Sequence, residues 1–104
     1  MTENHEIYNR LMGRLTSALG IADFEARNRE FKDIEAEANR LNQYEIVEES
    51  RRMRREKDFS RLAWLQRENR KEEALKLIAY IRKEWPDMES QRSCDRYERA
   101  INGE

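Results

Sequence analysis

Residues 21–85 read IADFEARNREFKDIEAEANRLNQYEIVEESRRMRREKDFSRLAWLQRENRKEEALKLIAYIRKEW and contain neither glycine nor proline. Glycine weakens the interior of a helix and proline breaks it, so neither residue interrupts a helix here. Glutamate, lysine, arginine, leucine and alanine dominate the stretch, and all five are strong helix formers. The stretch therefore predicts an all-α fold. As one helix it would span about 98 Å at 1.5 Å per residue, so the open question is where it turns.

Two asparagines mark the expected turns within this stretch. Asn42 and Asn69 each open a sequence that resembles a capping box, with asparagine as the N-cap and glutamate three residues later. They predict that new helices begin just after residues 42 and 69. One long helix between residues 24 and 68 is the alternative, because an asparagine does not force a break.

The ends of the remaining helices are marked by cap residues. Gly20 follows an apolar stripe over residues 4–19 and is expected to be a left-handed C-cap. Asp23 and Asp87 stand where N-caps are needed, and Pro86 ends the helix before it. We expect a small bundle of four or five helices with short connections, forming a single all-helical domain over residues 1–104.

An apolar seam with seven-residue spacing runs over residues 24–41 and then stops. Its positions are Phe24, Arg27, Phe31, Ile34, Ala38 and Leu41. Fewer than three heptads do not specify a coiled coil, so the seam suits packing inside a bundle. Because charged residues make up 41% of the chain and hydrophobic ones 38%, the core of a monomer is marginal. A homodimer, or a homo-oligomeric scaffold built along this seam, is therefore an alternative.

Residues 59–86 resemble a single tetratricopeptide-type helical hairpin. Leu62 and Leu65 lie in its first helix, Asn69 at the turn, and the second helix opens near Ala74 and ends at Pro86. Bulky side chains and an asparagine replace the small residues and turn glycine that the family prefers. The resemblance implies a helical hairpin, and such hairpins usually serve contacts between proteins.

Few residues offer catalytic or metal-binding chemistry. With His5 as the only histidine and Cys94 as the only cysteine, a Cys/His zinc site within one chain is excluded. Cys94 lies on an apolar stripe with Tyr97, Ala100 and Ile101 and is expected to be a packed thiol. Three carboxylates share a helical face but alternate with basic residues, which predicts a solvated face: Glu30, Asp33 and Glu37. We therefore expect no enzyme activity, no cofactor and no metal.

The cellular environment is expected to be the cytoplasm. Residues 1–6 lack the basic start and apolar run of a signal peptide, and no stretch approaches the ~18 apolar residues of a membrane span. A single cysteine forms no intramolecular disulfide, which fits a reducing compartment.

The sharpest local signal is a basic segment in the middle of the chain. Residues 47–71 hold nine basic and five acidic residues, whereas both flanks are net acidic. Between Glu48 and Asp58 only Met53 is apolar, so this segment is expected to be mostly solvated or bound to something charged. On a helix the arginines cluster on one side, with Arg52 paired to Glu48 and Glu56.

These observations predict a helical protein–protein interaction module with a contact surface at residues 47–67. It would be an adaptor, an assembly factor or an inhibitor that occludes a partner surface, the last being common among small phage or mobile-element proteins. The alternative is nucleic-acid binding through the basic helix at residues 51–61. The expected partner-binding residues are Arg51, Arg54, Arg55, Phe59, Arg61 and Trp64.

Overall fold

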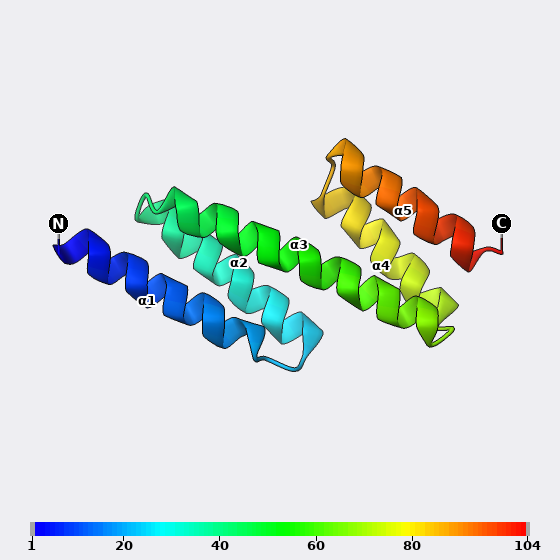
Figure 1. The fold of residues 1–104 in the computed structure, drawn as a ribbon, viewed down its shortest axis with the longest axis horizontal. Helices are drawn as coiled ribbons and strands as arrows, with labels where there is room; N and C mark the ends of the chain where they lie inside the picture. Colours follow the sequence, from blue (N-terminus) through cyan, green and yellow to red (C-terminus); the bar gives the residue numbers. More distant parts are fainter. Residues whose placement is uncertain (1, 104) are drawn as a thin grey trace. The chain divides into compact units, whose positions relative to one another are not determined.

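The computed structural model describes residues 2–103, which form five α-helices and no strand (Figure 1). The helices are α1 Thr2–Leu19, α2 Phe24–Arg40, α3 Tyr44–Arg67, α4 Lys71–Glu84 and α5 Met88–Ile101. Connections of three or four residues join them. The prediction of an all-α fold of four or five helices with short connections is confirmed.

The glycine- and proline-free stretch turns at both asparagines, so residues 24–68 are two helices. Asn42 and Asn69 adopt the left-handed conformation, with φ of 60° and 57°. Beside Asn42, the amide of Gln43 donates to the carbonyl of Ala38 at 2.7 Å, and the amide of Asn42 donates to that of Asn39 at 3.1 Å. The same pair of bonds forms around Asn69. This is the Schellman motif, in which a left-handed residue ends a helix.

Some of the predicted cap residues have the role expected of them, and others do not. Asp23 and Asp87 are N-caps, because their carboxylates accept hydrogen bonds from the backbone amides three residues on. The two asparagines were expected to be N-caps, but they end the preceding helices instead. The expected left-handed C-cap at Gly20 is also wrong. Among the described glycines only Gly103 has a positive φ, and the amide of Gly20 donates to Ser17 in a tight turn.

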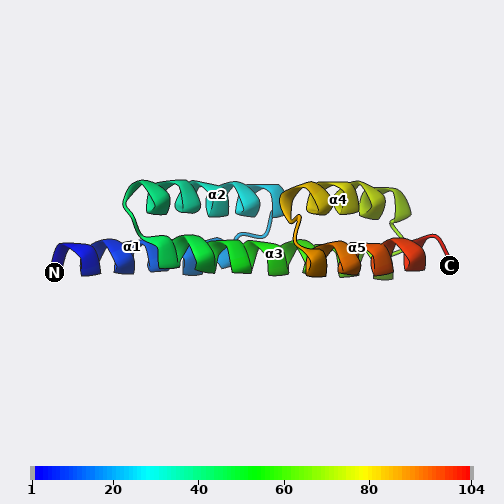
Figure 2. The ribbon, with the colours of Figure 1, turned by 90° about the horizontal axis from the view of Figure 1, so that it is seen from above.

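The chain divides within α3 into two compact units, one up to Arg54 and one from Arg55 onward. In the first unit, α2 lies in one layer and α1 and the beginning of α3 in another (Figure 2). Its core is a buried apolar cluster contributed by all three helices: Leu11, Leu15, Ala18, Phe31, Ile34, Ala38 and Ile46. The expectation that the whole chain is a single domain stays a prediction.

Ion pairs join α1 to α2 in the first unit. Arg14 lies 3.2 Å from Glu30, and Arg10 lies 2.9 Å from Glu37. The hydrogen bond from Arg10 lowers the pKa of the Glu37 carboxyl below its usual value. Two of the three carboxylates expected on a solvated face therefore pair with the neighbouring helix, while Asp33 is exposed.

The second unit consists of the rest of α3, α4 and α5. Its core residues are Leu62, Leu65, Ala74, Leu77, Ile78, Ile81, Trp85 and Cys94. Cys94 is fully buried as expected, and burial raises the pKa of its thiol. The Asn69 turn joins the end of α3 to the start of α4. The resemblance of this segment to a tetratricopeptide hairpin stays a prediction.

The middle of α3 is polar, yet three of its side chains are buried. They belong to a stripe of buried residues that winds slowly around the helix, because its spacing is mostly four residues and a turn takes 3.6: Ile46, Ser50, Arg54, Asp58, Leu62 and Leu65. The other residues of 48–58 are exposed or half-buried, and the buried Arg54 is bound to a charged group, as one of the two expectations had it. Polar groups can be buried when they find hydrogen-bond partners, and these partners come from other helices or connections.

Glu35 of α2 is the partner in the first unit. The Arg54 Nε and Nη2 atoms donate to the two Glu35 oxygens at 3.0 and 3.1 Å. The Ser50 hydroxyl lies 2.8 Å from Glu35 Oε2. In the second unit the Trp85 indole donates to Asp58 at 2.8 Å. The polar stripe thus connects α3 to α2 in one unit and to the end of α4 in the other.

Candidate interaction groove between α3 and α5

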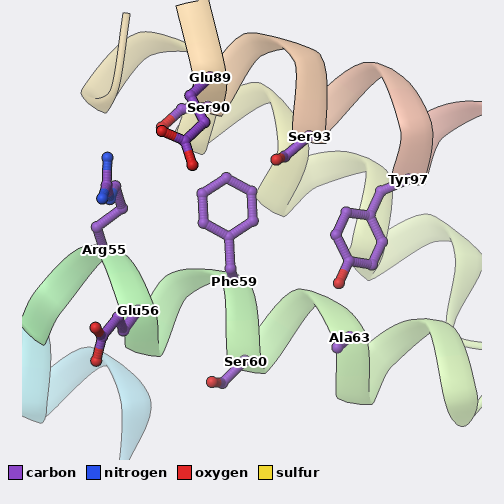
Figure 3. A pocket seen from close by; sticks show the side chains of 9 residues that line it. All are labelled: Arg55, Glu56, Phe59, Ser60, Ala63, Glu89, Ser90, Ser93 and Tyr97. Carbon is purple, nitrogen blue, oxygen red and sulfur yellow. The ribbon is translucent and has the colours of Figure 1, made fainter. Parts of the chain in front are cut away.

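A groove of about 530 Å³ lies between the second half of α3 and α5, entirely within the second unit (Figure 3). From α3 it is lined by Arg55, Glu56, Phe59, Ser60 and Ala63, and from α5 by Glu89, Ser90, Ser93 and Tyr97. The residues recur at three- and four-residue spacing, so each helix presents one face to the groove. On α5 this face adjoins the core, because the lining residue Ser90 is buried and Cys94 is buried one turn further on.

Two aromatic rings bridge the middle of the groove. Phe59 reaches up from α3 and Tyr97 points down from α5, as Figure 3 shows. Their ring centroids are 6.4 Å apart and the ring planes differ by 28°. Both side chains are only half-buried. Ala63 and Ser93, which line the groove beside the two rings, have small side chains that leave space in the groove unfilled.

One end of the groove is rich in carboxylates. Glu56 and Glu89 line it from the two helices, and Arg55 Nη1 lies 3.8 Å from Asp87 Oδ2. Asp87 accepts a hydrogen bond from the backbone amide of Ser90 at 2.9 Å, and this bond is the main reason that the pKa of its carboxyl is lowered. The guanidinium of Arg55 is therefore paired with Asp87 at this end of the groove.

A second hollow of about 370 Å³ lies farther along the same two helices. It is lined by Leu65, Gln66, Asn69, Arg70, Lys71, Ala100 and Ile101. Ala100 and Ile101 fall on the face of α5 that Ser93 and Tyr97 present to the first hollow. Among the described residues, the charged ones that line this second hollow are both basic: Arg70 from the α3–α4 connection and Lys71 from the start of α4. The first hollow, in contrast, also has acidic lining residues.

The structure separates the six residues expected to bind a partner. Arg55 and Phe59 line the groove. Trp64 is half-buried, with the guanidinium groups of Arg61 and Arg70 lying 4.8 and 4.9 Å from its ring centroid. Cation–π contacts of this kind hold the arginines in place.

The other two residues belong to the first unit. Arg51 is exposed, as expected. Arg54 was expected in the same accessible cluster, and this is wrong because its side chain is 2% exposed and paired with Glu35. Arg52 forms a salt bridge to Glu49, and its predicted pairing with Glu48 and Glu56 stays a prediction.

The α5 side of the groove was missed. Tyr97, Ala100 and Ile101 looked like a stripe shared with Cys94 and meant for the core, but Cys94 alone of these is buried. A usable signal was present in Glu89, Ser93 and Tyr97, which stand four residues apart. A small hydroxyl between a charge and an aromatic on one helical face is a poor core pattern.

The groove offers aromatic surface, hydroxyls and charged rims, which suit binding. Among residues 2–103, no group of three or more histidine, cysteine or acidic side chains is placed to hold a metal ion. None of the described helices has both the length and the apolar character needed to cross a membrane. Comparison with known proteins found no matching family model, no similar curated protein and no similar solved structure.

Proposed function

We propose that this protein is a non-catalytic interaction module that holds a segment of a partner protein in the α3–α5 groove. The observation that carries the proposal is the half-exposed Phe59–Tyr97 pair across a hollow of about 530 Å³. Aromatic side chains of this kind contribute large contact area at a small entropy cost and are enriched in binding hot spots. Holding a partner in this way is compatible with an adaptor, an assembly factor or an inhibitor that occludes a partner surface.

The pairing of the basic segment supports a protein partner over nucleic acid. Arg54 is buried against Glu35, Arg52 pairs with Glu49, and Arg55 lies beside Asp87. Nucleic-acid binding depends on cations that neutralise phosphates, and carboxylates beside these arginines oppose that role. Binding to random duplex or single-stranded DNA that strengthens as salt is lowered would favour the nucleic-acid alternative instead.

Burial of the apolar seam argues against a scaffold built along residues 24–41. Phe31, Ile34 and Ala38 are fully buried within one chain and belong to the core of the first unit. They are therefore not available to a second copy unless that unit opens. Light scattering over a dilution series tests this point, because a scaffold would increase in mass with concentration.

We also propose that the protein acts in a reducing compartment such as the cytoplasm. Its only cysteine, Cys94, is packed in the core of the second unit. Oxidising compartments favour disulfide-stabilised small domains, and this chain is stabilised by packing instead.

Selection from a displayed library of random peptides of about 12 residues tests the groove directly. Wild-type protein is compared with Ala63→Arg, which fills the groove, and with Ala79→Arg, which makes the same change at an exposed site in the same unit. We expect peptides that bind wild type and Ala79→Arg but not Ala63→Arg. Circular dichroism checks that both variants are folded. No enrichment on wild type, or equal binding to all three proteins, would contradict the proposed function.

A further inference from the structure

We infer that the occupant of the α3–α5 groove is an amphipathic helical segment with basic side chains at one end, apolar ones in the middle and acidic ones at the other end. This inference rests on the proposed function and specifies the chemistry of the partner. It follows from the order in which charged and aromatic residues line the two hollows along α3 and α5.

The acidic end selects basic side chains. Arg55, the arginine that lines this end, already lies 3.8 Å from Asp87, so the exposed carboxylate of Glu89 gives the end its negative charge. Glu89 makes no salt bridge to any residue in the described part of the chain. Figure 3 shows its carboxylate and the Arg55 side chain facing the same end of the groove. A lysine or arginine of the partner would balance this excess of negative charge.

The basic end selects carboxylates. Arg70 and Lys71 line the second hollow, and among residues 2–103 no acidic side chain lines it with them. Arg70 is positioned over the Trp64 ring, which leaves guanidinium N–H groups able to form a fork with a carboxylate. Its contact with Glu73, at 3.7 Å between two half-exposed side chains, is too long for a strong competing bond.

The distance between the two ends fits a short helix. Glu56 and Gln66 mark the ends on α3 and are ten residues apart, which corresponds to about 15 Å along a helix. A partner helix of roughly ten to 14 residues would cover both ends. Between them, Phe59, Tyr97 and Ile101 offer apolar surface to side chains at the i, i+3, i+4 and i+7 spacing of a helix lying in a groove.

Four fluorescein-labelled peptides of about 14 residues test the inference by fluorescence anisotropy. They share one helical background with central leucines and differ at the two ends, which are lysine and glutamate, lysine and lysine, glutamate and glutamate, or glutamine and glutamine. We expect the lysine–glutamate peptide to bind wild-type protein about three- to tenfold more tightly than the glutamine peptide at low salt, since each exposed pair is worth up to about 1 kcal/mol. The advantage should shrink at high salt.

Charge-reversal variants give the matched controls. Glu89→Lys places a basic residue at each end, so its preference should move from the lysine–glutamate to the glutamate–glutamate peptide. Lys71→Glu leaves one basic and one acidic residue at the second end, so the advantage of the lysine–glutamate peptide over the lysine–lysine peptide should disappear. The double variant should bind the lysine–glutamate and glutamate–glutamate peptides about equally. Both sites are exposed on the surface, and circular dichroism confirms that each variant is folded.

The outcomes separate the inference from the proposed function. If the glutamine peptide binds as tightly as the lysine–glutamate peptide, or if the variants do not change the preference, the inference is wrong while groove binding stands. If the lysine–glutamate peptide does not bind but library peptides do so in an Ala63→Arg-sensitive way, the partner chemistry is again wrong. If no peptide from either source binds, the proposed function fails as well.

Discussion

Removal of the Arg54 side chain is expected to cost a large part of the stability of the first unit. Arg54 is 2% exposed and Glu35 12% exposed, and two hydrogen bonds of 3.0 and 3.1 Å join them. In Arg54→Ala the Glu35 carboxylate keeps the Ser50 hydroxyl nearby but loses its cation. Breaking a buried pair by removing one partner typically costs about 3–5 kcal/mol. A chain of this size is stable by only about 5–15 kcal/mol.

Three further variants show whether the loss comes from the unpaired charge. The double variant Arg54→Met with Glu35→Met removes both charges, and should be near wild type or more stable because neither member of the pair is left buried without the other. Arg54→Lys keeps the charge but loses the bidentate hydrogen bonding to Glu35, so its loss of stability should be intermediate. Arg51→Ala changes an exposed arginine on the same helix and should alter the free energy of unfolding by no more than about 0.5 kcal/mol.

Urea unfolding at neutral pH is the assay, followed by two signals. Far-ultraviolet circular dichroism reports all helices, whereas both tryptophans, Trp64 and Trp85, lie in the second unit and report it by fluorescence. The circular dichroism midpoint should fall in Arg54→Ala and recover in the double methionine variant. A loss below about 1 kcal/mol in Arg54→Ala, or a double variant as unstable as the single one, would refute the buried-charge reasoning.

Three smaller predictions concern the helix interiors and ends. Gly13→Ala should raise the free energy of unfolding by about 0.5–1 kcal/mol, because Gly13 lies inside α1 and an added methyl group meets no atom within 4 Å. Asn69→Ala should lower it by about 1–2 kcal/mol in urea unfolding, and Asn69→Gly should not, because only glycine adopts the φ of 57° without strain. Asp87→Ala should lower it by about 0.5–2 kcal/mol at neutral pH through loss of the cap on α5. The folded-state pKa of Asp87 is lowered from 3.8, so its contribution is present above that pH and is lost as pH falls through the folded-state value.

Each of these has an outcome that contradicts it. A Gly13→Ala protein no more stable than wild type would mean that α1 is not helical at that position in solution. Equal losses for Asn69→Ala and Asn69→Gly would remove the left-handed turn as the cause. If wild type and Asp87→Ala lose stability equally between mildly and strongly acidic pH, the carboxylate of Asp87 does not cap α5.

The helix boundaries were largely predictable because they depend on local chemistry. Asp23 and Asp87 cap helices through amides three residues away, and such bonds need no tertiary partner. Asparagine is harder to interpret, because it both caps helix starts and tolerates the left-handed conformation at helix ends. The predicted positions of the two turns, at Asn42 and Asn69, were therefore correct. The predicted role of the asparagines as N-caps was not, because each ends the helix before it.

The groove was predictable only on its α3 side. Phe59 stands beside a basic segment, and that local context already marked it as a candidate for partner binding. Tyr97 is 38 residues further along the chain, and whether it enters the core or faces Phe59 depends on how α5 packs. Helical periodicity gives the faces of one helix but not the face of another helix that lies opposite.

The glycine- and proline-free stretch by itself determined that this protein is helical and where its helices end, since propensities and caps act over a few residues. It did not determine what the middle of α3 does, because that segment has almost no apolar side chain to indicate a buried face. Only the tertiary structure brings Glu35 to Arg54 and Trp85 to Asp58, across 19 and 27 residues of sequence. Burial of a polar side chain depends on a partner from elsewhere in the chain, so packing alone decided which residues of α3 are core and which are left to line the groove.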